Sequence, residues 1–216
     1  MAQGLLVLET PWDEDLKSPL SVGPFLQGLG ASLGFTVICQ RFNGKRDLVH
    51  YLEEFGRSGL LYCYIASHGT AGRLETLLEN VNGNTIASAC GHGRGRGFII
   101  GACSFGNRKT ATAFLSATRA AFVAGYSRDV PWGESMLTDL TFLTYVIGKR
   151  CHRRMENGRV ELVTTTGGEF KLQGSQDPMK VARWVYEDFP LSRALGVAVH
   201  RRVKRAGQWR IESSDD

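Results

Sequence analysis

The sequence predicts an α/β fold, a three-layer sandwich with a mostly parallel central sheet followed by C-terminal β-hairpins. Five continuous apolar runs have the length of strands, and segments with helical periodicity lie between them. Strands buried on both faces of a helix-covered parallel sheet are continuously apolar, so this pattern favours that class. A chain of 216 residues can bury about 70% of its unfolded surface, which is enough for one core without a disulfide or a metal.

The first three elements are expected within residues 4–42. GLLVLET at 4–10 predicts a strand, and GFTVICQRF at 34–42, which is rich in β-branched residues, predicts a second. Between them, the apolar spacing over 18–33 allows a helix, although Pro24 and three glycines weaken it. Such a unit can join two parallel strands.

A second helix is expected after Gly44, in KRDLVHYLEEFGRSG. Its apolar residues fall on one helical face: Leu48, Leu52 and Phe55. Asp47 is expected to cap its N-terminus and Gly56 to end it. The apolar run LLYCYIAS then predicts a third strand that leads into His68.

The middle of the chain predicts two further strands and two helices. Residues 73–97 indicate a short amphipathic segment and a glycine-rich connection. Strands are expected over 97–103 and 120–127, with a short helix over 109–120 between them. The segment 132–150 predicts a helix with an apolar stripe: Leu137, Leu140, Leu143 and Ile147.

The C-terminal part predicts two hairpins around one helix. GRVELVTTTGGEFKLQ indicates a hairpin that turns at Gly167 and Gly168, and LGVAVHRRVKRAGQWRIES a second that turns near Gly207. The helix is expected over 177–189. We therefore divide the chain into a core, residues 1–150, and an extension, residues 151–216, packed on the same domain.

The formal net charge of +5 is concentrated in KRCHRR at 149–154 and HRRVKR at 200–205. Such runs can neutralise phosphates, lie as solvated faces or attract an acidic protein. Because no aromatic residue interrupts either run, direct nucleic-acid binding is not expected.

The cysteines indicate a reducing, cytoplasmic setting. They are odd in number and lack the paired spacing of metal ligands: Cys39, Cys63, Cys90, Cys103 and Cys151. We therefore expect neither a metal nor a cofactor. No apolar run approaches the roughly 18 residues needed to cross a bilayer, so no membrane association is expected.

Two of the predicted strands lead into chemically active residues. The third runs into His68 and Gly69, and the fourth runs through Gly101 and Ala102 into Cys103. Because ligand sites of open α/β sheets lie beyond the carboxyl ends of the strands, we expect His68 and Cys103 to lie side by side. An imidazole can take the proton of a neighbouring thiol, and exposed amides beside small residues can stabilise an oxyanion.

These motifs resemble those of caspase-like cysteine peptidases, the clan of caspases, metacaspases, gingipains, separases and bacterial CHAT-type proteases. The resemblance lies in LLYCYIASHG and FIIGACSFG and covers about residues 4–150. Cys103 follows His68 by 35 residues, whereas the spacing in caspases is about 50. The shorter spacing suits a compact bacterial member.

The resemblance implies a cysteine endopeptidase that acts on protein substrates. By it, Cys103 is the nucleophile, His68 the general base or acid, and the amides of Gly69 and Cys103 the oxyanion hole. Many bacterial members are regulated effectors in stress or antiviral defence, so an activating or inhibitory protein partner is also implied.

The sequence departs from the family at the pocket for the residue before the scissile bond. Caspases carry Gln and metacaspases Asp two positions before the cysteine, where this chain has Gly101. The acidic loop ETPWDED, with Asp13 and Asp15, and the later Asp129 are candidates for receiving a Lys or Arg side chain. An acidic surface loop without such a role is the commoner explanation for residues of this kind.

Other interpretations of the sequence remain. A second His-Gly at His92, beside Cys90, follows no predicted strand and is not expected to act as the base. The chain can also be a catalytically silent scaffold or binding module, although the intact His/Cys pair argues against this. A phosphate-binding role for GHGRGRG is disfavoured because this loop precedes a strand and lacks the Lys-Ser/Thr of a P-loop.

Overall fold

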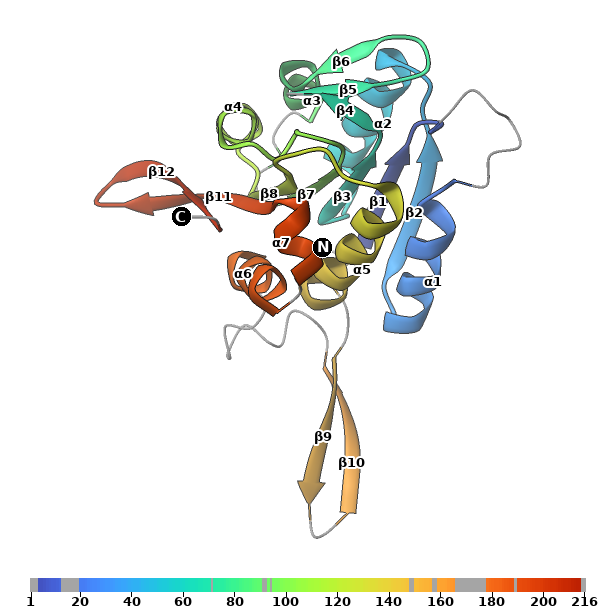
Figure 1. Ribbon diagram of the computed structural model, residues 1–216, viewed down its shortest axis with the longest axis vertical. Coiled ribbons are helices and arrows are strands. Elements are labelled where there is room, and N and C mark those ends of the chain that lie inside the picture. The colour runs from blue at the N-terminus through green and yellow to red at the C-terminus, as the bar shows by residue number, and fades with distance from the viewer. Residues whose placement is uncertain are drawn as a thin grey trace.

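A seven-stranded, mostly parallel sheet forms the centre of the molecule and has helices on both faces (Figure 1). The computed structural model describes residues 4–12, 20–70, 72–90, 93, 95–147, 150–156, 159–165, 178–188 and 190–214. The strand order is β12-β11-β8-β7-β3-β1-β2. The predicted α/β class is therefore confirmed.

All five apolar runs form the parallel part of this sheet: β1 (Gly4–Glu9), β2 (Thr36–Arg41), β3 (Tyr62–Ala66), β7 (Gly97–Gly101) and β8 (Phe122–Tyr126). Every residue of β1, β7 and β8 is buried, which explains their continuous apolarity. By contrast, β2 lies at the edge of the sheet and is largely exposed.

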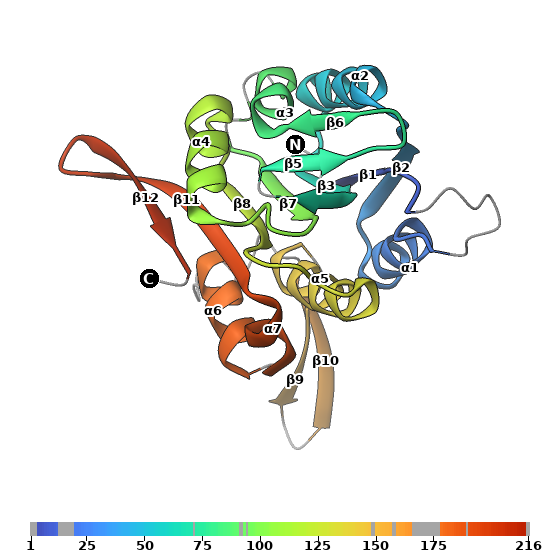
Figure 2. The same cartoon turned by 45° about the horizontal axis from the view of Figure 1, so that its top comes forward.

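Two separate hydrophobic clusters lie on the two faces of the sheet. Leu6 and Leu8 of β1 pack with α2 (Lys45–Arg57), α3 (Gly83–Ala89) and α4 (Arg108–Thr118). Leu5 and Val7, which point the other way, pack with α1 (Gly23–Leu33), α5 (Trp132–Val146) and α6 (Pro178–Asp188). Figure 2 shows these two helix layers on opposite sides of the sheet.

The ends of helix α2 differ from those expected from the sequence. Leu48, Leu52 and Phe55 of α2 are buried as expected, but Gly44 is the N-cap and the helix continues past Gly56 to Arg57. Asp47 lies in the first turn, where its carboxylate accepts a bond of 3.1 Å from the Asn43 N–H.

The apolar stripe predicted for α5 is wrong at its start. Leu137 is 62% exposed, whereas Leu143 and Ile147 are buried. The buried face instead begins at Met136 and passes through Asp139. Because the buried face includes the polar residue Asp139, the spacing of apolar residues alone does not identify it.

A small three-stranded sheet, β4-β5-β6, was not predicted. It consists of β4 (His68–Thr70), β5 (Arg73–Glu75) and β6 (Asn80–Asn82) and is followed by α3, whose N-terminus Asn82 caps. Strands of three residues are too short for an alternating pattern to be recognised. The short helix α7 (Pro190–Leu195) was also missed.

The C-terminal strands form two hairpins. As predicted, β11 (Val197–Arg205) and β12 (Gln208–Ser213) pair across Gly207, and β11 extends the central sheet antiparallel to β8. In the other, β10 (Arg159–Thr165) pairs with the preceding strand β9 (Arg150–Glu156). The predicted turn at Gly167 and Gly168 lies outside the described residues, and the Asn157-Gly158 hairpin signal was overlooked.

Among the described residues, no helix has both the length and the apolar character needed to cross a membrane.

Candidate active site

Three segments that follow neighbouring parallel strands meet at one pocket of about 100 Å³. Trp12 follows β1, His68 follows β3, and Cys103 follows β7. The chain order of the strands reverses between β1 and β3, which is the switch point where open α/β sheets bind ligands. The remaining lining consists of Leu20, Ser67, Gly101, Ala102, Val130, Trp132 and Ser135.

A larger hollow of about 480 Å³ lies between α2 and α3, but most of its lining residues are polar, and they include neither a cysteine nor a histidine. We therefore assign the chemistry to the smaller pocket, which contains both.

The imidazole of His68 is oriented by a backbone carbonyl. Its Nε2 lies 2.7 Å from the carbonyl oxygen of Trp12, and the Trp12 ring packs edge-on against it at 5.3 Å. Because a carbonyl oxygen only accepts hydrogen bonds, Nε2 must carry the proton. In the neutral ring, Nδ1 is then the nitrogen able to accept a proton.

A buried carboxylate fixes Trp12, the residue that supplies this carbonyl. Glu9, at the end of β1, accepts a bond of 2.8 Å from the Trp12 indole N–H. It also accepts bonds of 2.7 Å from the Ser21 hydroxyl and the Val22 N–H. Glu9 therefore ties Trp12 on one side, and Ser21 and Val22 on the other, to the end of β1. Sequence reasoning missed both Trp12 and the role of Glu9.

Cys103 lies in a tight turn at the end of β7. The N–H of Val130 points at its sulfur at 3.4 Å, and a donor at this position stabilises negative charge on sulfur. The next residue, Ser104, has a φ of 54°, which is uncommon for a residue other than glycine. Such backbone persists only where its surroundings enforce it, and it clusters at functional sites.

Several hydrogen bonds enforce the turn. Ser104 donates its N–H to the Arg128 carbonyl at 3.1 Å and its hydroxyl to the Asp129 carboxylate at 3.2 Å. The Asn107 side chain donates to the Ser104 carbonyl at 2.6 Å and also caps α4. Asp129, predicted as a pocket residue, thus holds the turn and lies outside the pocket lining.

The C-terminal hairpin also reaches this turn. The buried His200 of β11 lies with Nε2 2.8 Å from the Gly106 carbonyl, and its Nδ1 lies 2.9 Å from the Ser213 hydroxyl of β12. Because the carbonyl only accepts, Nε2 donates and the serine hydroxyl donates to Nδ1. No pattern in the sequence indicated this contact between residues 94 positions apart.

Gly69 lets two backbones approach closely beside the sulfur. A Cβ at this position would lie 2.8 Å from the Cys103 carbonyl oxygen and 3.2 Å from the Cys103 nitrogen. Among the described residues, the Cys103 N–H has no hydrogen-bond partner. An unpaired N–H at this position can donate to a developing oxyanion.

The absence of a side chain at Gly101 has a packing reason. A Cβ there would clash with the Tyr64 hydroxyl and lie 3.3 Å from Asp139 Oδ2. This site therefore has no room for the Gln or Asp found at the corresponding position in caspases and metacaspases. The other two pocket candidates, Asp13 and Asp15, lie outside the described residues.

The remaining cysteines with described side chains are poor nucleophiles. Burial raises the pKa of Cys63 well above its usual value and that of Cys90 to about 12. Burial and the nearby Glu9 carboxylate raise the pKa of Cys39. Thiols of raised pKa carry little thiolate at neutral pH. His92, the alternative base, lies outside the described residues.

A buried polar cluster lies directly beneath the site. Asp139 of α5 accepts a bond of 2.6 Å from the Tyr126 hydroxyl and another from the Tyr64 hydroxyl. Burial raises the pKa of Asp139 to about 7, although these two hydrogen bonds act to lower it. The sequence offered no signal for this cluster because its members come from β3, β8 and α5.

Because burial raises the pKa of Asp139, we expect the free energy of unfolding to fall as the pH rises. The folded-state pKa is above the usual value of 3.8, so the folded protein holds the proton more strongly than the unfolded chain. The contribution is fully present below pH 3.8 and is lost as the pH rises through about 7. Urea unfolding across this range should show a loss on the order of 2–4 kcal/mol from this residue.

Asp139→Asn should remove that pH dependence, whereas Glu53→Gln on the exposed side of α2 should leave it unchanged. Equal pH profiles for the parent and Asp139→Asn proteins would show that Asp139 does not titrate in this way.

No protein-family model matches the sequence, and no curated protein matches it. The candidate site therefore rests on the placement of Trp12, His68 and Cys103 around one pocket.

Proposed function

We propose that this protein is a cysteine endopeptidase that cleaves protein substrates through a His68/Cys103 dyad. The observation that carries the proposal is that both residues line one pocket, with His68 Nε2 held by the Trp12 carbonyl. The turn after Cys103 and the close approach at Gly69 add support. A catalytically silent scaffold is the alternative, and a well-folded protein without thiol reactivity would favour it.

In the proposed mechanism, His68 Nδ1 takes the proton of the Cys103 thiol, and the thiolate attacks the peptide carbonyl carbon. The resulting oxyanion accepts hydrogen bonds from the amides of Cys103 and Gly69. The protonated His68 then gives its proton to the leaving amine, which leaves a thioester on Cys103. Water activated by His68 hydrolyses this thioester and restores the thiol.

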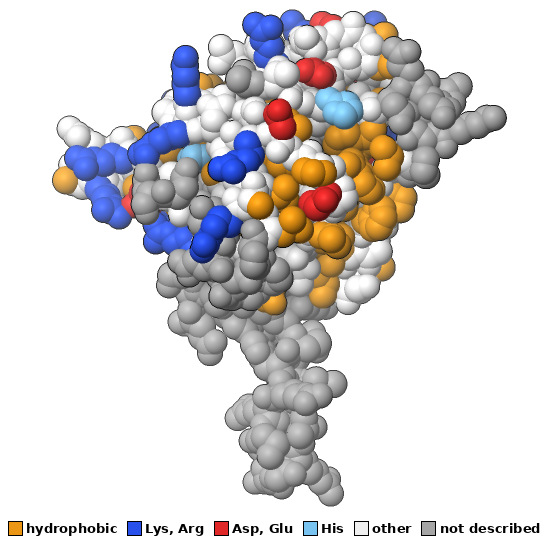
Figure 3. Space-filling model, viewed as in Figure 1, with side chains coloured by type: hydrophobic (Ala, Val, Ile, Leu, Met, Phe, Trp, Pro, Cys, Tyr) orange, Lys and Arg blue, Asp and Glu red, His pale blue; other side chains and the backbone are white. Residues whose placement is uncertain are grey.

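The pocket favours an apolar side chain in the residue before the scissile bond. Because Cys103 lies in the lining of this pocket, the side chain next to the attacked carbonyl would enter it. Four other lining residues are apolar: Trp12, Leu20, Val130 and Trp132. Asp139 lies behind Gly101 and already binds two tyrosines. Figure 3 shows hydrophobic side chains gathered on this face, over α5 and toward α1. The sequence-based alternative is cleavage after Lys or Arg.

A peptide library should therefore show cleavage after Leu, Met or Phe. Trp132→Ala should lower kcat/KM for these peptides by about tenfold, because it removes apolar contact with the bound side chain. Leu137→Ala, on the exposed side of the same helix, is the control and should have little effect. Cleavage after Lys or Arg that weakens in Asp13→Ala or Asp15→Ala would instead support the acidic-loop hypothesis.

A covalent thiol probe with mass-spectrometric mapping tests the nucleophile without a known substrate. We expect labelling of Cys103 in preference to Cys39, Cys63 and Cys90, whose thiols have raised pKa values. Preferential labelling of one of those three would contradict the proposal.

We also propose that the peptidase is a regulated bacterial effector in the reducing cytoplasm, controlled by a protein partner or by cleavage. The resemblance to the caspase-like clan supports this part, and the free thiols Cys39, Cys63, Cys90 and Cys103 agree with a reducing setting. Full activity of a freshly purified, uncut chain would remove the need for a trigger.

A further inference from the structure

The β11-β12 hairpin concentrates positive charge on a projecting ribbon. Its two strands carry five cationic side chains and one carboxylate: Arg201, Arg202, Lys204, Arg205, Arg210 and Glu212. Lys204, Arg205 and Arg210 lie near the turn at Ala206 and Gly207 and are exposed. Figures 1 and 2 both show the tip of this hairpin extending away from the helices.

An exposed tryptophan lies among these cations. Trp209 of β12 is 60% exposed and pairs with Lys204 of β11. The guanidinium of Arg202 lies 4.4 Å from the centroid of the Trp209 ring. Because directly paired residues and those two positions away share a face, Arg202, Lys204 and Trp209 form one surface. The linear sequence did not show this surface, since no aromatic residue interrupts the basic run.

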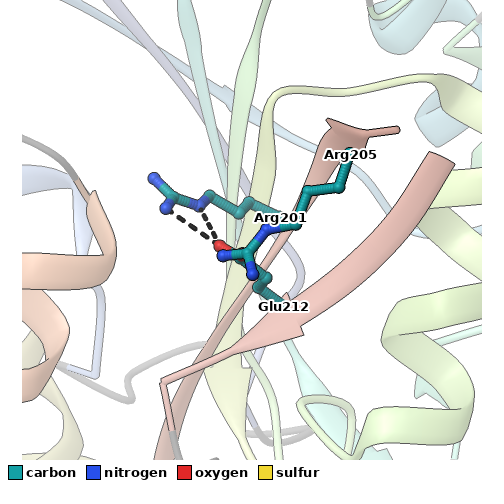
Figure 4. A network of polar contacts seen from close by, with 3 residues as sticks. All are labelled: Arg201, Arg205 and Glu212. Carbon is teal, nitrogen blue, oxygen red and sulfur yellow. Dashed lines mark hydrogen bonds and ion pairs between the residues drawn. The ribbon is translucent and has the colours of Figure 1, made fainter. Parts of the chain in front are cut away.

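The opposite face holds its arginines in fixed positions. Glu212 accepts bonds of 3.0 and 2.9 Å from Nε and Nη2 of Arg201 and a further bond from Arg205 (Figure 4). Glu212 uses donors of both arginines and offsets part of their charge, so these two guanidinium groups are less available to phosphate oxygens than Arg202 and Lys204. Both faces of the ribbon thus carry cations, and those beside Trp209 are Arg202 and Lys204.

Protection of the sheet edge explains only part of this arrangement. β12 is the outermost strand, and charged side chains on an edge strand oppose pairing with other chains. The same purpose disfavours a large exposed aromatic ring. The Arg202 guanidinium covers one face of the Trp209 ring, and with 60% of the residue exposed, the other face can receive a ligand.

We propose that the β11-β12 hairpin binds single-stranded nucleic acid, with a base stacked on Trp209 and phosphates bound by the surrounding Arg and Lys side chains. Unpaired bases stack on aromatic rings, whereas duplex bases are already stacked on one another. An acidic polypeptide would use the cations but need no stacking platform. This binding site is independent of the proposed peptidase activity.

Fluorescence anisotropy with the full chain tests the proposal. Single-stranded RNA and DNA oligonucleotides are compared with a duplex of the same sequence and with polyglutamate, over a series of KCl concentrations. We expect a single strand to bind more tightly than the duplex or polyglutamate. Trp209→Ala should weaken that binding by about tenfold, and Trp209→Phe should retain most of it.

Charge variants separate phosphate contacts from general charge. Lys204→Gln should lower the slope of log affinity against log salt concentration by about 1. Arg46→Gln removes an exposed cation from α2 and should leave the slope unchanged. The proposal is overturned if no oligonucleotide binds at about 50 mM KCl, a salt low enough for electrostatic contacts to be strong. It is also overturned if Trp209→Ala binds as well as the parent, or if polyglutamate binds equally well.

Discussion

Cys103→Ala is expected to abolish peptide cleavage, because no other described thiol lies in the pocket to replace it. Labelling by the thiol probe at this position should be lost as well. His68→Ala should lower cleavage on the order of 10³-fold or more, since proton transfer both to and from the reacting groups is lost. The two residues act as one unit, so the double variant should be scarcely worse than Cys103→Ala. Steady-state peptide hydrolysis measures all three.

Folding should survive these substitutions, because His68 is exposed and Cys103 is only partly buried at the end of its strand. Melting temperatures should stay within a few degrees of the parent value. Cys90→Ala, which alters a buried thiol away from the pocket, should keep its activity. A well-folded Cys103→Ala protein that still cleaves its substrate would falsify the proposed mechanism.

Gly69→Ala is expected to reduce kcat by about 100-fold, because a displacement of about 1 Å at a catalytic group can have that effect. The added Cβ would lie 2.8 Å from the Cys103 carbonyl oxygen and 2.9 Å from the Ala102 Cβ. Neither atom can move away by a side-chain rotation, so the turn that holds the sulfur must shift. Overpacking of this kind also lowers stability by about 1–3 kcal/mol.

The matched control is Gly133→Ala in α5, where nothing lies within 4 Å of the added Cβ. Because Gly133 lies in the first turn of α5, this change should stabilise the protein by only about 0.5 kcal/mol and leave kcat unchanged. Single-turnover kinetics and urea unfolding of both variants separate the two effects. Normal kcat in a folded Gly69→Ala protein would mean that the close approach at Gly69 does not position Cys103.

Much of the fold follows from local sequence patterns. Strands β1, β7 and β8 are buried on both faces, so their apolarity is continuous and visible without a structure. The buried face of α2 follows from the helical spacing of Leu48, Leu52 and Phe55. The β4-β5-β6 sheet escaped prediction because its three-residue strands are set by pairing with each other.

The candidate site divides in the same way. His68 and Cys103 could be selected because each follows a buried strand, and parallel strands present their carboxyl ends at one edge of the sheet. The Trp12 carbonyl, the Glu9 contacts and the His200 bond to Gly106 could not be selected. Backbone acceptors carry no residue-type signal, and the partners of these contacts lie on separate elements.

By itself, the sequence determined the α/β class, the strands of the parallel sheet and the two residues at their ends, because these depend on periodicity and on chain order. Only the tertiary structure decided what surrounds them. It placed Asp139 between Tyr64 and Tyr126, closed the Gly101 position to any side chain, and set Trp209 beside Arg202. Each of these depends on how strands and helices pack or on which residues pair across a hairpin, and such contacts between separate segments leave no pattern in the linear sequence.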